Sequence, residues 1–279
     1  MTVSRLDARF AELKRQDRAA FVAYVMAGDP DADTSLGILQ GLPAAGADLI
    51  ELGLPFSDPM ADGPPIQRAA LRALKAGMTV RGALGLVSRF READGETPIA
   101  LMGYLNPLLT YGLAAFARDA ASAGVDGLII VDCPPEEAAP LADALDAHHL
   151  ALIRLAAPTT DDARLAIVAQ RTRGFVYYVS VAGVTGGKEA EAARIAPAVA
   201  RVRAASGLPV AVGFGIRTPE RAAEVARVAD GAVVGSALVD QIAEALAQNR
   251  DPVSKVLDTA ALLAKSVRSA RGERRLEAP

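Results

Sequence analysis

Short apolar runs and amphipathic stretches alternate along most of the chain. Eight apolar runs have the length and the Val, Ile and Leu content of buried strands, at residues 21–26, 49–52, 98–102, 127–131, 151–156, 175–180, 209–214 and 231–235. Stretches rich in Ala, Leu and Arg have helical periodicity, at residues 31–43, 64–76, 112–123, 136–147, 160–171, 189–205, 219–228 and 237–246. Further helices are predicted at residues 4–16, 80–92 and about 252–267.

This alternation predicts a parallel sheet, because each return between parallel strands needs a crossover such as a helix. Eight such units in 279 residues are typical of an α/β (β/α)8 TIM barrel. An open doubly wound sheet is the alternative, but the first strand-to-helix turn, AGDPDAD, lacks a G-x-G-x-x-G fingerprint. No linker divides the chain, so we expect residues 1–279 to form a single barrel domain.

Composition and charge exclude several classes of protein. The net charge of −3, without a block of basic residues, argues against a nucleic-acid-binding surface. No apolar run approaches the roughly 18 residues of a membrane span, and the N-terminus has no secretion core. Cys133 is the single cysteine of the sequence, which excludes an internal disulfide and fits a reducing compartment. We expect a cytoplasmic protein.

The stretch ADLIELGLPFSDPMADGPPIQ, residues 47–67, carries the strongest chemical signal. A strand-like run ends on Glu51, Asp62 follows in a loop, and a helix is predicted to begin near Pro64. A carboxylate at the end of a buried strand, with a second one in the next loop, is typical of acid/base catalysis. The alternative is a surface glutamate on a wrongly predicted strand, since burial of an unpartnered carboxylate is unfavourable.

The position of each acidic residue relative to the strands predicts its end of the barrel, because active sites lie at the carboxyl ends. Three aspartates precede strands and are predicted to be structural: Asp48, Asp126 and Asp230. Three acidic residues end or follow strands and are predicted to lie at the catalytic mouth: Glu51, Asp62 and Asp132.

The last two strand-to-helix turns, VGFGIRTPE and VVGSALVD, predict a phosphate site. Gly213 and Gly215 would let the backbone approach a ligand, and Gly235 and Ser236 open a helix whose N–H groups can bind an anion. Tight turns without a ligand are the alternative. The loop VAGVTGGKEA could form a lid, with Gly186 near the same phosphate.

The sequence lacks the residues that Schiff-base or metal-dependent aldolase chemistry would need. No lysine lies on a predicted strand, as a Schiff-base aldolase would need, and the only histidines, His148 and His149, lie before a strand. Cys133 has no histidine placed to activate it and is interpreted as a packing residue. Cofactor-free acid/base chemistry on a phosphorylated substrate remains.

Six motifs together resemble the alpha chain of tryptophan synthase, over roughly residues 21–246: LIELGLPFSDPMADGPPIQ, LMGYLNPLLTYG, GVDGLIIVDCPPEE, FVYYVSVAGVTG, VGFGIRTPE and VVGSAL. The resemblance implies a retro-aldol cleavage of indole-3-glycerol phosphate to indole and glyceraldehyde 3-phosphate. It implies that Glu51 is the general acid/base, that Asp62 holds the indole N–H, and that Tyr177 lines the mouth beside the glutamate.

The same resemblance implies the binding residues. The indole pocket would be lined by Tyr24, Met102, Tyr104, Ile129 and Val131, although plain barrel core is the alternative for Met102 and Ile129. Thr185 in the lid would bond to the aspartate, and the phosphate cradle would contain Gly186, Phe214, Gly215, Gly235 and Ser236. Three positions depart from the family's usual pattern or interrupt a strand: Val131, Arg154 and Ala182.

The resemblance also implies a partner, a beta chain that carries pyridoxal phosphate and receives indole in an alpha2beta2 complex. No cofactor is expected in this chain. Loop residues would make the contact: Asp58, Pro59, Asn106 and Pro107. The alternatives are a stand-alone lyase, a non-catalytic phosphate-binding barrel, and an isomerase or prenyl-transfer barrel, which the residues around Glu51 and Asp62 disfavour.

Overall fold

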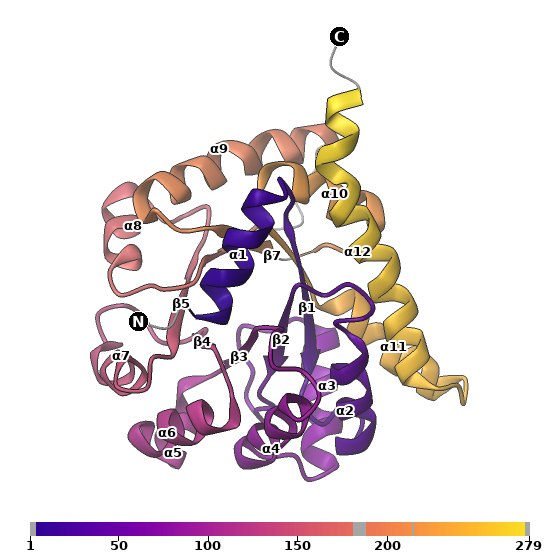
Figure 1. Ribbon diagram of the computed structural model, residues 1–279. Helices are drawn as coiled ribbons and strands as arrows, with labels where there is room; N and C mark the ends of the chain where they lie inside the picture. The colour runs from indigo at the N-terminus through magenta and orange to yellow at the C-terminus, as the bar shows by residue number, and fades with distance from the viewer. Residues whose placement is uncertain (1–3, 181–187, 214, 277–279) are drawn as a thin grey trace.

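Eight parallel strands close into a barrel in chain order (Figure 1), in a computed structural model that describes residues 4–180, 188–213 and 215–276. The strands are β1 (Ala20–Met26), β2 (Leu49–Gly53), β3 (Ile99–Gly103), β4 (Gly127–Ile130), β5 (Ala151–Ala156), β6 (Val176–Val179), β7 (Val210–Gly213) and β8 (Gly231–Val234). Parallel pairing of β1 with β8 closes the ring. The predicted TIM barrel is confirmed, and the open sheet is excluded.

Helices surround the barrel on its outer face (Figure 1). Those between successive strands are α2 (Ala32–Gly41), α3 (Pro64–Lys75), α4 (Val80–Arg91), α5 (Leu105–Tyr111), α6 (Leu113–Ala123), α7 (Ala139–Asp146), α8 (Asp162–Ala169), α9 (Lys188–Ser206) and α10 (Pro219–Val228). After β8 come α11 (Ser236–Ala247) and α12 (Pro252–Leu276). Within the described ranges, no helix is long and apolar enough to cross a membrane.

Helix α1 (Arg5–Arg15) covers the amino-terminal end of the barrel (Figure 1). Leu6, Phe10 and Leu13 form its buried stripe and join the cluster of side chains inside the barrel. The Phe10 ring lies 5.5 Å from the ring of Phe175, which comes just before β6. The apolar stripe of α1 therefore seals the end of the barrel opposite the strands' carboxyl ends.

The aspartates that precede strands fasten neighbouring strands at this same end. Asp48 accepts a 2.9 Å hydrogen bond from the Phe21 N–H at the start of β1 and pairs with Arg18 at 2.8 Å. Asp126 and Asp230 repeat the arrangement, each accepting from the first N–H of the preceding strand and pairing with arginine. The structural role predicted for these three aspartates is confirmed.

Three elements differ from the sequence prediction. β2 continues through Leu52 to Gly53, so Glu51 lies in the middle of the strand and does not end it. Helix α5 was not predicted, since Asn106 and Pro107 were assigned to a loop; a proline is nevertheless tolerated in the first turn of a helix. Helix α12 continues past Val267, where Ala, Arg and Glu residues favour helix.

Candidate active site

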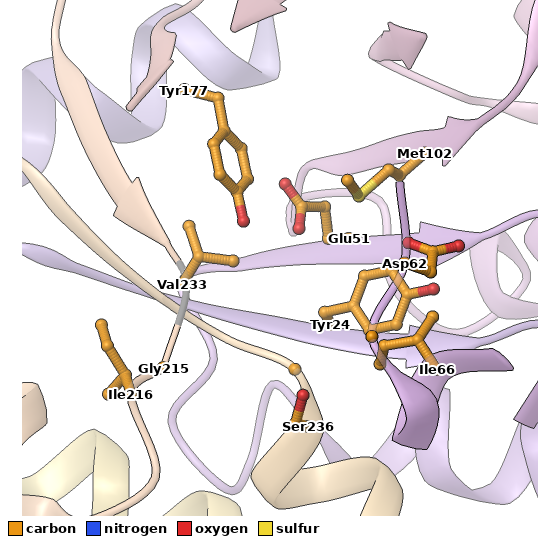
Figure 2. Close-up of a pocket in the computed structure, with 12 residues that line it drawn as sticks. Tyr24, Glu51, Asp62, Ile66, Met102, Tyr177, Gly215, Ile216, Val233 and Ser236 are labelled. Atoms are coloured by element: carbon orange, nitrogen blue, oxygen red, sulfur yellow. The ribbon is translucent and has the colours of Figure 1, made fainter. Parts of the chain in front are cut away.

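A cavity of about 110 Å³ lies at the carboxyl ends of the strands (Figure 2). It is lined by Tyr24, Glu51, Asp62, Gly63, Ile66, Met102, Tyr177, Gly215, Ile216, Val233, Gly235 and Ser236. In Figure 2, the Glu51 carboxyl and the Tyr177 hydroxyl enter from opposing strands, whereas Ser236 lies at the far side. The structure thus brings the predicted acid/base residues and part of the predicted phosphate site into one cavity.

Glu51 is fully buried, and among the described residues neither carboxyl oxygen has a hydrogen-bond partner. Its strand register places it beside Tyr24 of β1 and Ala100 of β3. Burial raises the pKa of Glu51 from 4.5 to about 8, because the charged form loses its hydration. The side chain is therefore a neutral carboxylic acid at pH 7, and the alternative of a surface glutamate is excluded.

Asp62 lies in the loop between β2 and α3, half-buried at the edge of the cavity. Burial raises its pKa, and a hydrogen bond from the Tyr104 hydroxyl opposes that rise. The same hydroxyl accepts a 2.9 Å hydrogen bond from the Ala61 N–H. Tyr104 thus fixes the loop that carries Asp62; its ring also lies 5.3 Å from that of Phe56. Tyr104 was predicted to line the cavity, but in the structure it supports the Asp62 loop and is not a lining residue.

Two buried tyrosines fill space that two glycines leave open. A Cβ at Gly213 would overlap the Tyr177 hydroxyl, and a Cβ at Gly53 would overlap that of Tyr24. Burial raises the pKa of both tyrosines well above 10, so both hydroxyls stay protonated. Gly213 was predicted to let the backbone approach a ligand. In the structure the Tyr177 ring occupies that space, and Gly213 does not line the cavity.

The Gly213→Ala variant is expected to lose about 1–3 kcal/mol of unfolding free energy, because the added methyl group overpacks the Tyr177 ring. Displacement of the Tyr177 hydroxyl should also reduce turnover about tenfold. Urea unfolding and an activity assay measure both effects. Gly95→Ala is the matched control, since nothing lies within 4 Å of its new Cβ. Equal stability of the two variants would contradict the packing argument.

The far side of the cavity is the amino-terminal end of α11. Within the part of the chain that the structure describes, no side chain caps this helix at Gly235, so its first N–H groups remain available to an anion. Gly215 has a φ of +77°, a left-handed conformation that favours glycine. The other predicted residues of the lid and phosphate cradle lie outside the described residues: Ala182, Thr185, Gly186 and Phe214.

Part of the predicted indole pocket is assembled. Tyr24 and Met102 line the cavity, as the resemblance implied. Ile129 is fully buried inside the barrel and does not border the cavity, which agrees with the core alternative. Val131 and Asp132 follow β4, which ends at Ile130, and they line a different cavity. Asp132 therefore lies at the carboxyl end of its strand, as predicted, but does not border the catalytic cavity.

Four lining residues were not predicted: Gly63, Ile66, Ile216 and Val233. Ile66 lies in the first turn of α3, directly after the Asp62 loop, and this proximity was an available signal. Val233 has only the pattern of an inward-facing strand residue, which does not distinguish cavity wall from core. Among the described residues, no group of three or more His, Cys, Asp or Glu side chains could hold a metal ion.

The predicted partner-contact residues lie on loops and helix α5. Asn106 and Pro107 line a surface groove of about 530 Å³ together with Phe56, Thr79, Val80, Arg81, Thr110 and Tyr111. Asp58 is exposed and accepts a 2.6 Å hydrogen bond from the Ser57 hydroxyl. Next to Pro59, the Met60 side chain is 79% exposed. This region therefore presents an exposed apolar side chain and an accessible groove.

Comparison with known proteins was made by sequence and by structure. Residues 10–268 match the family described as "Tryptophan synthase alpha chain". Alpha chains from Phenylobacterium zucineum and Caulobacter sp. are 72% and 70% identical, over 97% and 98% of this chain and 98% and 99% of theirs. The alpha subunit structure from Legionella pneumophila has a TM-score of 0.88 at 41% identity, covering 98% of this chain and all of that one.

A chain from the structure of Mycobacterium tuberculosis tryptophan synthase has a TM-score of 0.85 at 40% identity, covering 96% of this chain and 99% of that one. The sequence and the fold therefore match those of tryptophan synthase alpha chains over nearly the full length of this chain. The chain belongs to the tryptophan synthase alpha chain family, the lyases that cleave indole-3-glycerol phosphate to indole and glyceraldehyde 3-phosphate.

Proposed function

We propose that Glu51, Asp62 and Tyr177 carry out the cleavage of indole-3-glycerol phosphate in the cavity at the strands' carboxyl ends. The observation that supports this most directly is the state of Glu51. It is a buried carboxylic acid, protonated at neutral pH because of its raised pKa, whose oxygens have no partner among the described residues, and it borders a cavity whose far side is a helix amino terminus. The cavity therefore combines a proton donor, which suits a reactive ring, with an anion site, which suits a phosphate group of the same substrate.

Glu51 acts first as the general acid. Its proton goes to C3 of the indole ring, and the ring becomes a cationic indolenine that can accept an electron pair. The resulting carboxylate then takes the proton of the C3′ hydroxyl as the carbonyl of glyceraldehyde 3-phosphate forms. The electrons of the breaking C–C bond return to the ring. One proton is given and one is taken, so Glu51 ends as it began.

Asp62 stabilises the charge that develops on the ring. A carboxylate facing the indole N–H accepts its hydrogen bond, and that bond strengthens as the ring becomes cationic. The hydrogen bond from Tyr104 and the Ala61 N–H contact with the same hydroxyl support the loop in this position. An aspartate fixed before the substrate arrives needs little reorganisation during the reaction.

Tyr177 and Tyr24 form neutral walls around the ring. Their raised pKa values keep both hydroxyls protonated, so neither competes with Glu51 as a base. Met102, also on the cavity wall, gives the ring an apolar contact. We assign Tyr177 to the reacting end of the cavity because it borders the same space as the Glu51 carboxyl (Figure 2).

The phosphate is proposed to bind at the start of α11, against Gly235, Ser236 and the left-handed turn at Gly215. The family resemblance adds Gly186 and Phe214 to this cradle, and Thr185 as the lid residue that bonds to Asp62. This arrangement leaves the indole ring beside Glu51 and Asp62. The distance between phosphate and ring in the substrate then sets which carbon receives the proton.

The chain is proposed to work with a beta chain that holds pyridoxal phosphate and receives indole in an alpha2beta2 complex. Support comes from the relatives, since several matched chains belong to structures titled tryptophan synthase, one of them in an aminoacrylate-bound form. The proposed contacts are Asp58 and Pro59 in the loop between β2 and α3, and Asn106 and Pro107 in the first turn of α5. No cofactor is required for the proton transfers assigned to this chain.

Indole release from indole-3-glycerol phosphate, measured with and without a beta chain, tests this proposal. Slow release by the chain alone, raised at least about tenfold by the beta chain, is expected, because ordering of the mouth by a partner completes the site. Asn106→Ala should weaken that stimulation without changing the basal rate. Fast release with no response to the beta chain would contradict the partnership. No release in either condition would contradict the catalytic assignment.

A further inference from the structure

A second cavity, of about 340 Å³, is lined by residues of β4, β5, the segment that follows β4, and helix α8. Its walls are formed by Ile130, Val131, Asp132, Cys133, Pro134, Pro135, Ala138, Leu152, Ile153, Arg154, Leu155, Thr160, Arg164 and Val168. Within the described chain it shares no lining residue with the catalytic cavity. Its size lies within the range of pockets that hold small organic molecules.

Arg154 is the unusual side chain of this cavity. Its neighbours on β5, Ile153 and Leu155, pack inside the barrel, so Arg154 faces outward toward the helices. Only 8% of its surface is exposed, and among the described residues its Nε and Nη1 atoms have no hydrogen-bond partner. A guanidinium stays charged in proteins, so a buried cation here borders a cavity without a counter-charge bonded to these two atoms.

Two acidic residues near the cavity already have partners. Glu136 pairs with Arg164, which also lines the cavity. Asp132 accepts a 2.8 Å hydrogen bond from the Leu105 N–H. Burial lowers the pKa of Arg154, and the positive charges of Arg171 and Arg164 add to this effect, whereas Cys133 and Glu136 oppose it. An anion entering the cavity would therefore be attracted to Arg154 with little competition.

The rest of the wall is mainly aliphatic. Nine side chains of this kind border the cavity: Ile130, Val131, Pro134, Pro135, Ala138, Leu152, Ile153, Leu155 and Val168. An inorganic anion would leave this surface without apolar contacts, and an uncharged apolar molecule would leave the guanidinium unpaired. A molecule with one carboxylate and an apolar body satisfies both parts of the wall, because guanidinium and carboxylate match in shape and charge.

We propose that this cavity is a binding site for a small organic carboxylate, which pairs with Arg154 and places its apolar body against the aliphatic wall. A buried cation without a bound partner destabilises the folded chain, and replacement of such a charge by an apolar side chain is often stabilising. Features that lower stability without contributing to packing are typical of binding sites. The site is independent of the catalytic cavity and of the reaction proposed for it.

Benzoate and its uncharged isostere benzamide are suitable probes, with inorganic phosphate as the third. Binding to the full chain is measured by titration calorimetry and by the ¹⁵N-detected Nε–H signal of Arg154. All titrations are repeated with saturating glyceraldehyde 3-phosphate to occupy the catalytic cavity. Saturable benzoate binding that shifts the Arg154 signal and survives this competitor is expected, together with at least about tenfold weaker binding of benzamide.

Three variants make the test specific. Arg154→Met should weaken benzoate at least about tenfold and, in the absence of ligand, raise the Tm by about 2 °C or more. Arg154→Lys keeps the charge without the planar fork and should bind benzoate with intermediate affinity. Arg118→Met, which removes an exposed arginine on α6, controls for net charge and should bind benzoate like the wild type.

Three results would overturn the proposal. The first is equal benzoate affinity in the wild type and Arg154→Met. The second is saturation with benzoate without a shift of the Arg154 signal. The third is binding of phosphate in place of benzoate, which would assign the cavity to inorganic anions. Indole release by Arg154→Met should stay within about twofold of the wild type, because Arg154 lies outside the catalytic cavity.

Discussion

Replacement of Glu51 by glutamine is expected to slow indole release about 10³-fold, because general acid/base catalysis by one side chain contributes 10²- to 10⁴-fold. Glutamine keeps the shape of the side chain and removes its transferable proton. Glu51 borders the cavity with both oxygens unpartnered among the described residues, so few contacts are lost with it. Single-turnover assays on purified protein measure the effect.

Glu92→Gln is the matched control, since Glu92 is exposed at the end of α4 and far from the strands' carboxyl ends. It should release indole at the wild-type rate. If Glu51→Gln retained more than a tenth of the wild-type rate, another group would have to transfer the proton, and the assignment of Glu51 would be wrong.

The raised pKa of Glu51 adds a dependence on pH. Because the acid form donates the first proton, kcat/KM should fall as pH rises through about 8, the pKa of the free protein. Between 4.5 and about 8 the folded state holds a proton that the unfolded state has lost, so the unfolding free energy decreases as pH rises.

Glu51→Gln lacks this titration. The difference between its unfolding free energy and that of the wild type should shift in favour of the variant by roughly 3 kcal/mol between about pH 5.5 and 8. Urea unfolding at both pH values measures it. A difference that stays constant with pH would show that the Glu51 carboxyl ionises normally and is not buried in solution.

Asp62→Asn is expected to lower kcat about 10²-fold and to change KM little, because the lost charge acts on the cationic ring and not on the neutral substrate. Asparagine can still accept the hydrogen bond from Tyr104, so the loop should keep its conformation. Steady-state kinetics in the absence of a partner chain separates the two constants.

Asp33→Asn serves as the control for this variant, since Asp33 is an exposed carboxylate in the first turn of α2. Its kcat and KM should match those of the wild type. A rise in KM with unchanged kcat in Asp62→Asn would assign Asp62 to ground-state binding and contradict its role in stabilising charge during the reaction.

The sequence predicts the fold closely because every strand of this barrel is apolar and every crossover contains a helix. The alternation of these two patterns leaves few topologies, and the strand order follows from it. Glu51 was conspicuous because it interrupts an apolar run. Its interruption of that run also suggested an early strand end, which is wrong because a protonated carboxyl is compatible with a barrel interior. That residues 1–279 form a single domain stays a prediction.

Other features depend on contacts between distant segments. Gly213 and Tyr177 lie on neighbouring strands, so their shared space is a property of the strand register. Ile66 and Val233 are ordinary apolar residues in sequence, and only the barrel brings them to one cavity. Arg154 interrupts an apolar run, which does not show whether its side chain faces into or out of the barrel. That its Nε and Nη1 atoms have no partner among the described residues is known only from the three-dimensional structure.

The seal at the amino-terminal end of the barrel also determines when α1 can be buried during folding. Helix α1 is the first element to be synthesised, but Phe10 packs against Phe175, which comes just before β6, and Leu6 lies beside Gly174. Leu6 and Phe10 therefore stay exposed to water until most of the polypeptide has been synthesised. During translation, the apolar stripe of this helix remains exposed until the ribosome has delivered the segment that precedes β6.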